Sequence, residues 1–167
     1  MKKSLSLFHP AKFIGTWFGT GLAPKAPGTF GSIAALPFAW VIQTHYGNNA
    51  LFIASIIAFF VGWVACHFYM PHSEAKDPRE MVIDEVSGQW LLLSFMYPTL
   101  TSYIVGLALF RLFDVIKPWP VSVADRKIGG GFGVMIDDTL AALYPIIIFY
   151  ILNYFDLGAP ILAFLAK

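Results

Sequence analysis

The sequence predicts an all-α membrane protein, a small polytopic helical bundle, and three observations support this fold class. First, 57% of the 167 residues are hydrophobic and only 13% are charged, whereas a soluble domain usually carries about twice that share of charge. Second, the mean hydropathy is +0.67. Third, long uncharged blocks alternate with compact charged patches, as expected of a chain that crosses a bilayer several times. We expect one domain over residues 1–167 with about three to four spanning helices.

Four apolar blocks are the candidate helices. Gly31–Gln43 is a short first candidate, Ala50–Met70 is long enough to cross about 30 Å of hydrocarbon, and Thr139–Phe155 is the last clear span. The block Val86–Phe110 contains a helix breaker at Pro98. We expect this block to form a Pro-broken hairpin that enters and leaves on one side, and a single crossing is the alternative.

The basic residues predict the orientation. Four lysines precede the first block, whereas the loop Thr44–Asn49 contains no Lys or Arg. Because basic loops stay in the cytoplasm, the N-terminus should be cytoplasmic. A hairpin over Val86–Phe110 places the charged patches on both sides of it on that same face. No nucleic-acid partner is expected, and the oligomeric state is not fixed by the sequence.

Two pairs of carboxylates predict a metal site. Asp84 and Glu85 directly precede an uncharged block, and Asp137 and Asp138 directly precede the last one. Ionised carboxylates near a membrane are costly unless they are paired or bind a metal. Acidic residues that merely cap helices or favour the helix dipole are the alternative. Because these are oxygen ligands without Cys–His spacing, Mg²⁺ is the expected ion.

Basic and hydroxyl groups beside the carboxylates predict a phosphate site. Arg111 and Asp114 are three residues apart in an expected helix, and Lys117 follows three residues later. A Gly- and Pro-rich loop also runs into the first helix, where free backbone N–H groups can bind an anion. The expected phosphate-binding residues are Lys25, Thr29, Arg79, Arg111 and Lys117. The expected catalytic residues are Asp84, Glu85, Asp114, Asp137 and Asp138.

Four segments together resemble the phosphatidylglycerophosphatase A family of bacterial lipid phosphatases. They are Gly19–Ser32, Asp77–Gln89, Phe110–Pro120 and Gly129–Asp138, in this order and over about 120 residues of the chain. By position, the acidic motif residues of the family fall on Asp77, Asp84, Glu85, Asp114, Asp137 and Asp138.

The resemblance implies a Mg²⁺-dependent enzyme of the bacterial inner membrane that converts phosphatidylglycerophosphate to phosphatidylglycerol and phosphate. It implies a multi-pass protein whose partners are this lipid and the bilayer, with the active site facing the cytoplasm. Our mechanistic hypothesis is that Asp84, Glu85, Asp137 and Asp138 hold Mg²⁺ and that activated water attacks phosphorus. Cationic side chains then stabilise the equatorial oxygens. An aspartyl-phosphate intermediate is the alternative.

Other classes fit the residues less well. The chain lacks the Asp-x-Asp-x-Thr signature of haloacid dehalogenase phosphatases, since Asp137-Asp138-Thr139 has the wrong spacing. A small ion transporter would place its carboxylates in mid-helix, whereas here they lie where helices begin. A membrane assembly factor would need no such acidic cluster.

Overall fold

The computed structural model of the chain describes residues 5–75 and 78–155, and every regular element in these ranges is helical. The all-α prediction is therefore confirmed. In chain order the elements are α1 (Pro10–Gly15), the 3-10 turn η1 (Thr20–Leu22), α2 (Pro27–Tyr46), α3 (Asn48–Tyr69), the 3-10 turn η2 (Met70–His72), α4 (Ile83–Leu93), α5 (Leu100–Ile116), α6 (Val121–Lys127) and α7 (Gly130–Tyr154).

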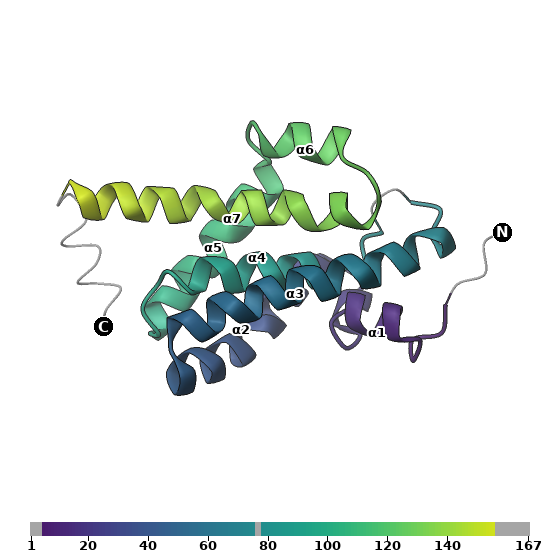
Figure 1. Ribbon diagram of the computed structural model, residues 1–167, viewed down its shortest axis with the longest axis horizontal. Coiled ribbons are helices and arrows are strands. Elements are labelled where there is room, and N and C mark those ends of the chain that lie inside the picture. The colour runs from purple at the N-terminus through teal and green to yellow at the C-terminus, as the bar shows by residue number, and fades with distance from the viewer. Residues whose placement is uncertain (1–4, 76–77, 156–167) are drawn as a thin grey trace.

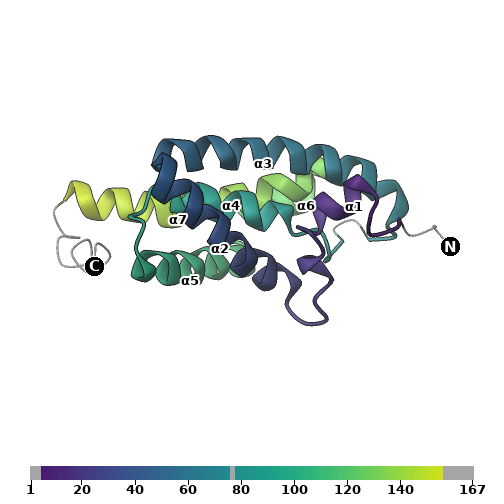
Figure 2. The ribbon, with the colours of Figure 1, turned by 90° about the horizontal axis from the view of Figure 1, so that it is seen from below.

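The short helix α4 is the centre of the bundle. It packs against α2, α3, α5 and α7 (Figures 1 and 2), and all of its residues except Glu85 and Leu91 are buried. Gly88 allows the closest approach, because a Cβ there would lie 2.7 Å from the Phe110 ring of α5 and 2.9 Å from the Asp138 carbonyl oxygen of α7. The first turn of α4, which bears two carboxylates, is thereby surrounded by protein.

Helices α4 and α5 form the predicted hairpin. The chain leaves helical structure after Leu93 and resumes it at Leu100, where the Thr99 hydroxyl caps α5 by accepting a hydrogen bond from the Ser102 N–H. The start of α4 and the end of α5 meet again at the other end, because Arg111 Nη1 lies 3.4 Å from Glu85 Oε1. The hairpin therefore brings the second and third charged patches together.

A buried polar clamp holds the turn of the hairpin. The Gln43 amide of α2 donates hydrogen bonds to the carbonyl oxygens of Leu93 and Met96, both at 2.9 Å. Its own oxygen accepts a hydrogen bond of 2.7 Å from the Tyr103 hydroxyl of α5. One side chain thus satisfies backbone groups that irregular structure leaves without helical partners.

The segment before α4 is not helical and is fixed from both sides. The Val82 N–H donates a hydrogen bond of 2.8 Å to the carbonyl oxygen of Gly15, at the end of α1. The Tyr69 hydroxyl of α3 donates one of 2.6 Å to Glu80. Gly15 leaves room for the Met81 side chain, because a Cβ at position 15 would lie 1.9 Å from Met81 Cε. Helices α1 and α3 therefore hold the segment that leads to the first carboxylates.

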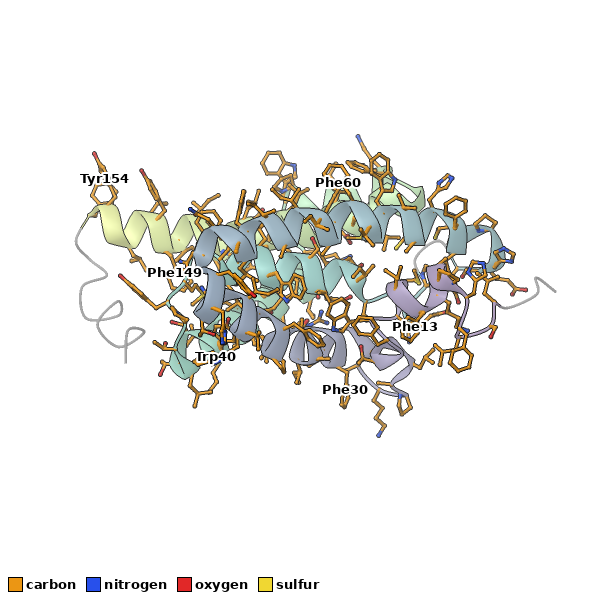
Figure 3. All side chains as sticks on the ribbon, turned by 60° about the horizontal axis from the view of Figure 1, so that its bottom comes forward. Phe13, Phe30, Trp40, Phe60, Phe149 and Tyr154 are labelled. Carbon is orange, nitrogen blue, oxygen red and sulfur yellow. The ribbon has the colours of Figure 1, made fainter. Side chains whose placement is uncertain are left out.

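Among the residues that the structure describes, two helical stretches are long and apolar enough to cross a membrane. They are Asn48–His72, with a mean hydropathy of 2.2, and Gly130–Leu152, with a mean hydropathy of 1.7. The sequence predicted about three to four such helices, and α2 begins at Pro27 rather than at Gly31. Helix α7 begins at Gly130 rather than at Thr139, so the expectation that Asp137 and Asp138 precede this helix is wrong, because the glycines before them continue the helix instead of forming a loop. Many large apolar side chains lie exposed on the outside of the bundle, among them Phe30, Trp40 and Phe60 (Figure 3). An exposed apolar surface of this extent suits contact with lipid.

We expect Gln43→Leu to lower the free energy of unfolding in detergent by about 1–3 kcal/mol, because it leaves buried carbonyl groups without a donor. Thermal unfolding followed by circular dichroism would measure the change. Thr44→Val is the matched control, since the exposed Thr44 hydroxyl bonds mainly within its own helix. Equal stability of the two variants would contradict the role of the clamp.

Candidate functional site

A polar cavity of about 610 Å³ lies where the beginnings of α2 and α4, the end of α5 and the first turns of α7 meet. Charged side chains dominate its wall. These are Arg79, Asp84, Glu85, Arg111, Asp114, Lys117, Asp137 and Asp138, and the rest of the wall comes from Ala26, Pro27, Gly28, Pro78, Met81 and Val115.

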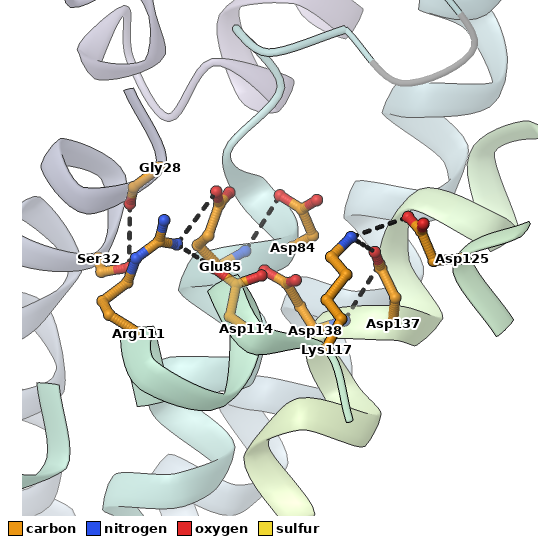
Figure 4. A network of polar contacts seen from close by, with 10 residues as sticks. All are labelled: Gly28, Ser32, Asp84, Glu85, Arg111, Asp114, Lys117, Asp125, Asp137 and Asp138. Carbon is orange, nitrogen blue, oxygen red and sulfur yellow. Dashed lines mark hydrogen bonds and ion pairs between the residues drawn. The ribbon is translucent and has the colours of Figure 1, made fainter. Parts of the chain in front are cut away.

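Three carboxylates converge in this cavity. Asp84 and Glu85 come from the first turn of α4, and Asp138 comes from α7 (Figure 4). One oxygen of each lies within 4.8 Å of the others. Glu85 Oε2 and Asp138 Oδ2 are buried and have no hydrogen-bond partner among the described residues. Buried carboxylate oxygens without donors are costly, and a cation shared by the three would remove that cost.

Burial opposes the negative charge of this cluster. It raises the pKa of Glu85 to about 6, and the neighbouring Asp114 carboxylate adds to the shift, while Arg111 opposes it. Burial also raises the pKa of Asp84 well above its usual range, and repulsion from Glu85 and Asp138 adds to it. Either protons or a bound cation must therefore compensate the charge.

The cations of the cavity do not balance its carboxylates. Five carboxylates face three basic groups, so the wall carries an excess of two negative charges when all are ionised. A phosphate dianion would be repelled from such a wall unless a divalent cation came with it. The all-oxygen donor set, with no Cys or His among the lining residues, fits Mg²⁺.

Arg111 joins two of the carboxylates. Its Nη1 atom lies 2.5 Å from Asp114 Oδ2 and 3.4 Å from Glu85 Oε1. Asp114 is one turn further along α5, so the pair follows from helical i,i+3 spacing. Arg111 is thereby held with its guanidinium at the cavity wall.

Lys117 joins two further carboxylates across three helices. It ends α5 in the left-handed conformation, with φ of 45°, and its Nζ atom lies 2.5 Å from Asp137 Oδ2 and 2.8 Å from Asp125 Oδ1. Burial disfavours the ammonium, but the hydrogen bonds to Asp125 and Asp137 outweigh this and raise the pKa of Lys117 above its ordinary range. Lys117 is therefore a fixed positive charge.

Comparison with known proteins assigns the chain to a family. The family model described as phosphatidylglycerophosphatase A matches residues 13–153. The chain belongs to the phosphatidylglycerophosphatase A family. The chain is therefore an enzyme of the phosphatase class, as the sequence predicted, and its two candidate spans together with this lipid-phosphatase family indicate a membrane protein.

Individual relatives cover nearly the whole chain. Phosphatidylglycerophosphatase A of Haemophilus influenzae is 33% identical over 156 residues, which is 93% of this chain and 96% of the relative. The Escherichia coli protein of the same name is 32% identical over 159 residues, 94% of this chain and 92% of the relative. A Bacteroides thetaiotaomicron protein named for phosphatidylinositol-3-phosphatase activity is 35% identical over 148 residues, 81% of this chain and 88% of the relative. No solved structure shows a significant match.

Most of the predicted site residues lie together around the polar cavity. Arg111, Asp114 and Lys117 line the cavity with the three-carboxylate cluster, and the exposed Arg79 lies at its edge. Asp137 also lines it, but its Oδ2 atom accepts a hydrogen bond from Lys117 and does not join that cluster. Asp77 lies outside the described residues.

Two of the predicted phosphate-binding residues are not part of the cavity wall. Lys25 is exposed and Thr29 is half-buried, whereas their neighbours Ala26, Pro27 and Gly28 line the cavity. Successive residues of a helix point about 100° apart, so Gly28 rather than Thr29 faces Glu85. Asp125 was not predicted, since nothing in the sequence shows that α6 returns to Lys117.

We expect Gly28→Ala to abolish most of the phosphatase activity. A Cβ at this position would lie 1.9 Å from Glu85 Oε1 and 3.0 Å from Arg111 Nη1, so Glu85 must move out of the cluster. Phosphate release would measure the loss, which we expect to be roughly 100-fold, as for a misplaced catalytic group.

Ile33→Ala is the control for Gly28→Ala, because Ile33 is exposed on the same helix. We expect it to keep nearly the wild-type rate. Full activity of Gly28→Ala would show that the position of Glu85 is not important for the reaction.

Proposed function

We propose that this enzyme hydrolyses the terminal phosphomonoester of phosphatidylglycerophosphate to phosphatidylglycerol and phosphate in glycerophospholipid biosynthesis, with Mg²⁺ as cofactor. The single observation that carries the proposal is the cluster of the buried Asp84 and Asp138 with the half-buried Glu85, in a cavity with excess negative charge. Relatives named phosphatidylglycerophosphatase A along nearly the full chain support the substrate.

The acidic residues would hold the cofactor. Asp84, Glu85 and Asp138 would supply three oxygen ligands from two helices, the donor type that Mg²⁺ prefers. Bound Mg²⁺ supplies charge neutralisation at the phosphoryl group and lowers the pKa of coordinated water. The two buried oxygens of Glu85 and Asp138 that have no partner among the described residues support this ligand set.

The basic residues would hold the phosphoryl group. Arg79, Arg111 and Lys117 all border the cavity, and their donors can stabilise the equatorial oxygens as water attacks phosphorus in line. The bond from phosphorus to the glyceryl oxygen breaks, and that oxygen takes up a proton. Asp114 holds Arg111, and Asp137 holds Lys117, so these carboxylates act by positioning the cations.

The site would face the cytoplasmic leaflet of the bacterial inner membrane. The loop Thr44–Asn49 carries no Lys or Arg, whereas the charged patches around the cavity carry several. The hairpin keeps both patches on one side, and the exposed apolar side chains of α2 and α3 suit the acyl region of the bilayer. A lipid phosphate in the adjacent leaflet could then reach the cavity without leaving the membrane.

We expect purified enzyme in mixed micelles to release phosphate from phosphatidylglycerophosphate, to lose this activity in EDTA, and to recover it with added Mg²⁺. Asp84→Asn and Asp138→Asn should each lower the rate by about 100-fold or more. Losing a side chain that binds the metal directly should cost more than the 10–100-fold effect of losing one that only orients such a side chain. Glu74→Gln is the matched control, since Glu74 is an exposed carboxylate outside the cavity.

Near-normal turnover of both Asp variants, or full activity in EDTA, would overturn the cofactor assignment. Phosphatidylinositol 3-phosphate should be assayed in parallel, because one relative is named for that activity. Faster release from it would overturn the substrate assignment and leave the phosphatase class unchanged.

We expect labelling with a membrane-impermeant maleimide to place α6 in the cytoplasm. Cys66 is the single cysteine and is buried, so cysteines introduced by Tyr46→Cys and Lys127→Cys, both at exposed positions, supply the reactive thiols. In intact spheroplasts the first variant should react and the second should not, whereas permeabilised cells should label both. The reverse pattern would refute the orientation.

A further inference from the structure

A second cavity adjoins the one that holds the three carboxylates. It measures about 300 Å³, lies between α6 and the first turns of α7, and includes Asp125, Gly130, Gly133 and Asp137 in its wall. Asp137 belongs to the walls of both cavities. Lys117 lines the larger cavity and is bonded to Asp125 in the smaller one. The hydrogen-bonded side chains of Asp125, Lys117 and Asp137 thus lie between the two cavities, and Figure 4 shows all three.

The chemistry of the smaller cavity suits hydroxyl groups better than a second phosphate. Two carboxylates, Asp125 and Asp137, face it, and Lys117 already bonds to both. Each carboxylate oxygen has two lone pairs, so these side chains can accept further hydrogen bonds from neutral hydroxyls. A phosphate placed beside them would meet like charge, and Arg126, which also lines the cavity, already takes part in another interaction.

The size and lining of the cavity also suit a small polyol. Its volume is at the lower end of the range for pockets that bind small molecules. Glycines form one side of it, so backbone rather than side chains lines that wall and a ligand can approach closely.

We propose that this cavity, between α6 and the start of α7, binds the glyceryl unit of the leaving group and that the Asp125 carboxylate accepts a hydrogen bond from its hydroxyl. This rests on the proposed function, because the scissile oxygen belongs to that glyceryl unit and the unit must lie beside the space that holds the phosphoryl group. Asp125 is then a residue that determines head-group preference, and Lys117 couples it to the phosphate site.

Inhibition by the two products tests the proposal. Phosphatidylglycerol carries the glyceryl unit without the terminal phosphate, whereas inorganic phosphate corresponds to the terminal phosphate without the glyceryl unit. In mixed micelles at fixed lipid mole fraction, we expect Asp125→Asn to weaken inhibition by phosphatidylglycerol by about 10-fold, the lower end of the value of one hydrogen bond to a charged group, because Asn keeps a carbonyl acceptor. Inhibition by phosphate should stay within about twofold of wild type.

A second variant reaches the same cavity without touching the ion pairs. Val134→Phe adds bulk to the wall and should weaken inhibition by phosphatidylglycerol in the same direction, with phosphate again unaffected. Lys127→Gln is the control, because Lys127 is exposed on α6 and is not part of the cavity wall. It should leave both inhibition constants unchanged.

Two results would overturn the proposal. Equal weakening of both inhibitors by Asp125→Asn would show that Asp125 acts only through Lys117, and no change in either would show that the cavity does not bind the head group. Wild-type enzyme that releases no phosphate from phosphatidylglycerophosphate would instead refute the proposed function. The two failures are therefore distinguishable.

Discussion

Repulsion among buried carboxylates is the constraint on which this structure depends. Asp84, Glu85 and Asp138 are brought within a few ångströms of one another on two helices that carry no basic residue, and no fold gains stability from such a contact by itself. The surrounding protein partly compensates it. Arg111 and Lys117 reach the cavity from the end of α5, and each is held by carboxylates on its own or a neighbouring helix. The remaining imbalance suits a cation-dependent reaction.

The packing of the bundle places these groups with little freedom. Helix α4 is enclosed by four helices, and Gly28 and Gly88 allow α2, α5 and α7 to approach its first two turns closely. Because Gly28 and Gly88 have no side chains, the helices that carry the charged groups can pack directly against one another. Such contacts resist reorganisation better than contacts between long side chains. The far end of the hairpin is fixed independently by Gln43, so the two ends of α4 are anchored by different interactions.

The sequence predicted the parts of the fold that follow from one-dimensional pattern. Uncharged blocks became helices and Pro98 marked the hairpin. Asp84 and Glu85 lie in the first turn of α4 as expected, whereas Asp137 and Asp138 lie about two turns inside α7. It could not predict features that depend on the direction of a side chain. Gly28 rather than Thr29 faces Glu85, and the α2 start at Pro27, upstream of the expected Gly31, decides this. Asp137 and Asp138 are neighbours in sequence, yet one contacts Lys117 and the other the carboxylate cluster, because adjacent helical residues point in different directions.

The attachment of α1 to the segment before α4 has a practical consequence for handling this protein. The Gly15 carbonyl and the Val82 amide connect the N-terminal region to the non-helical stretch that leads to Asp84, and Met81 fills the space that Gly15 leaves. Leu5 packs against the core and the His9 side chain caps α1, so an affinity tag belongs ahead of Leu5 rather than directly ahead of Pro10. A deletion that removes α1 would take away one of the two attachments of residues 78–82 and leave only the hydrogen bond from Tyr69 to Glu80, so expression vectors should retain the whole amino-terminal segment.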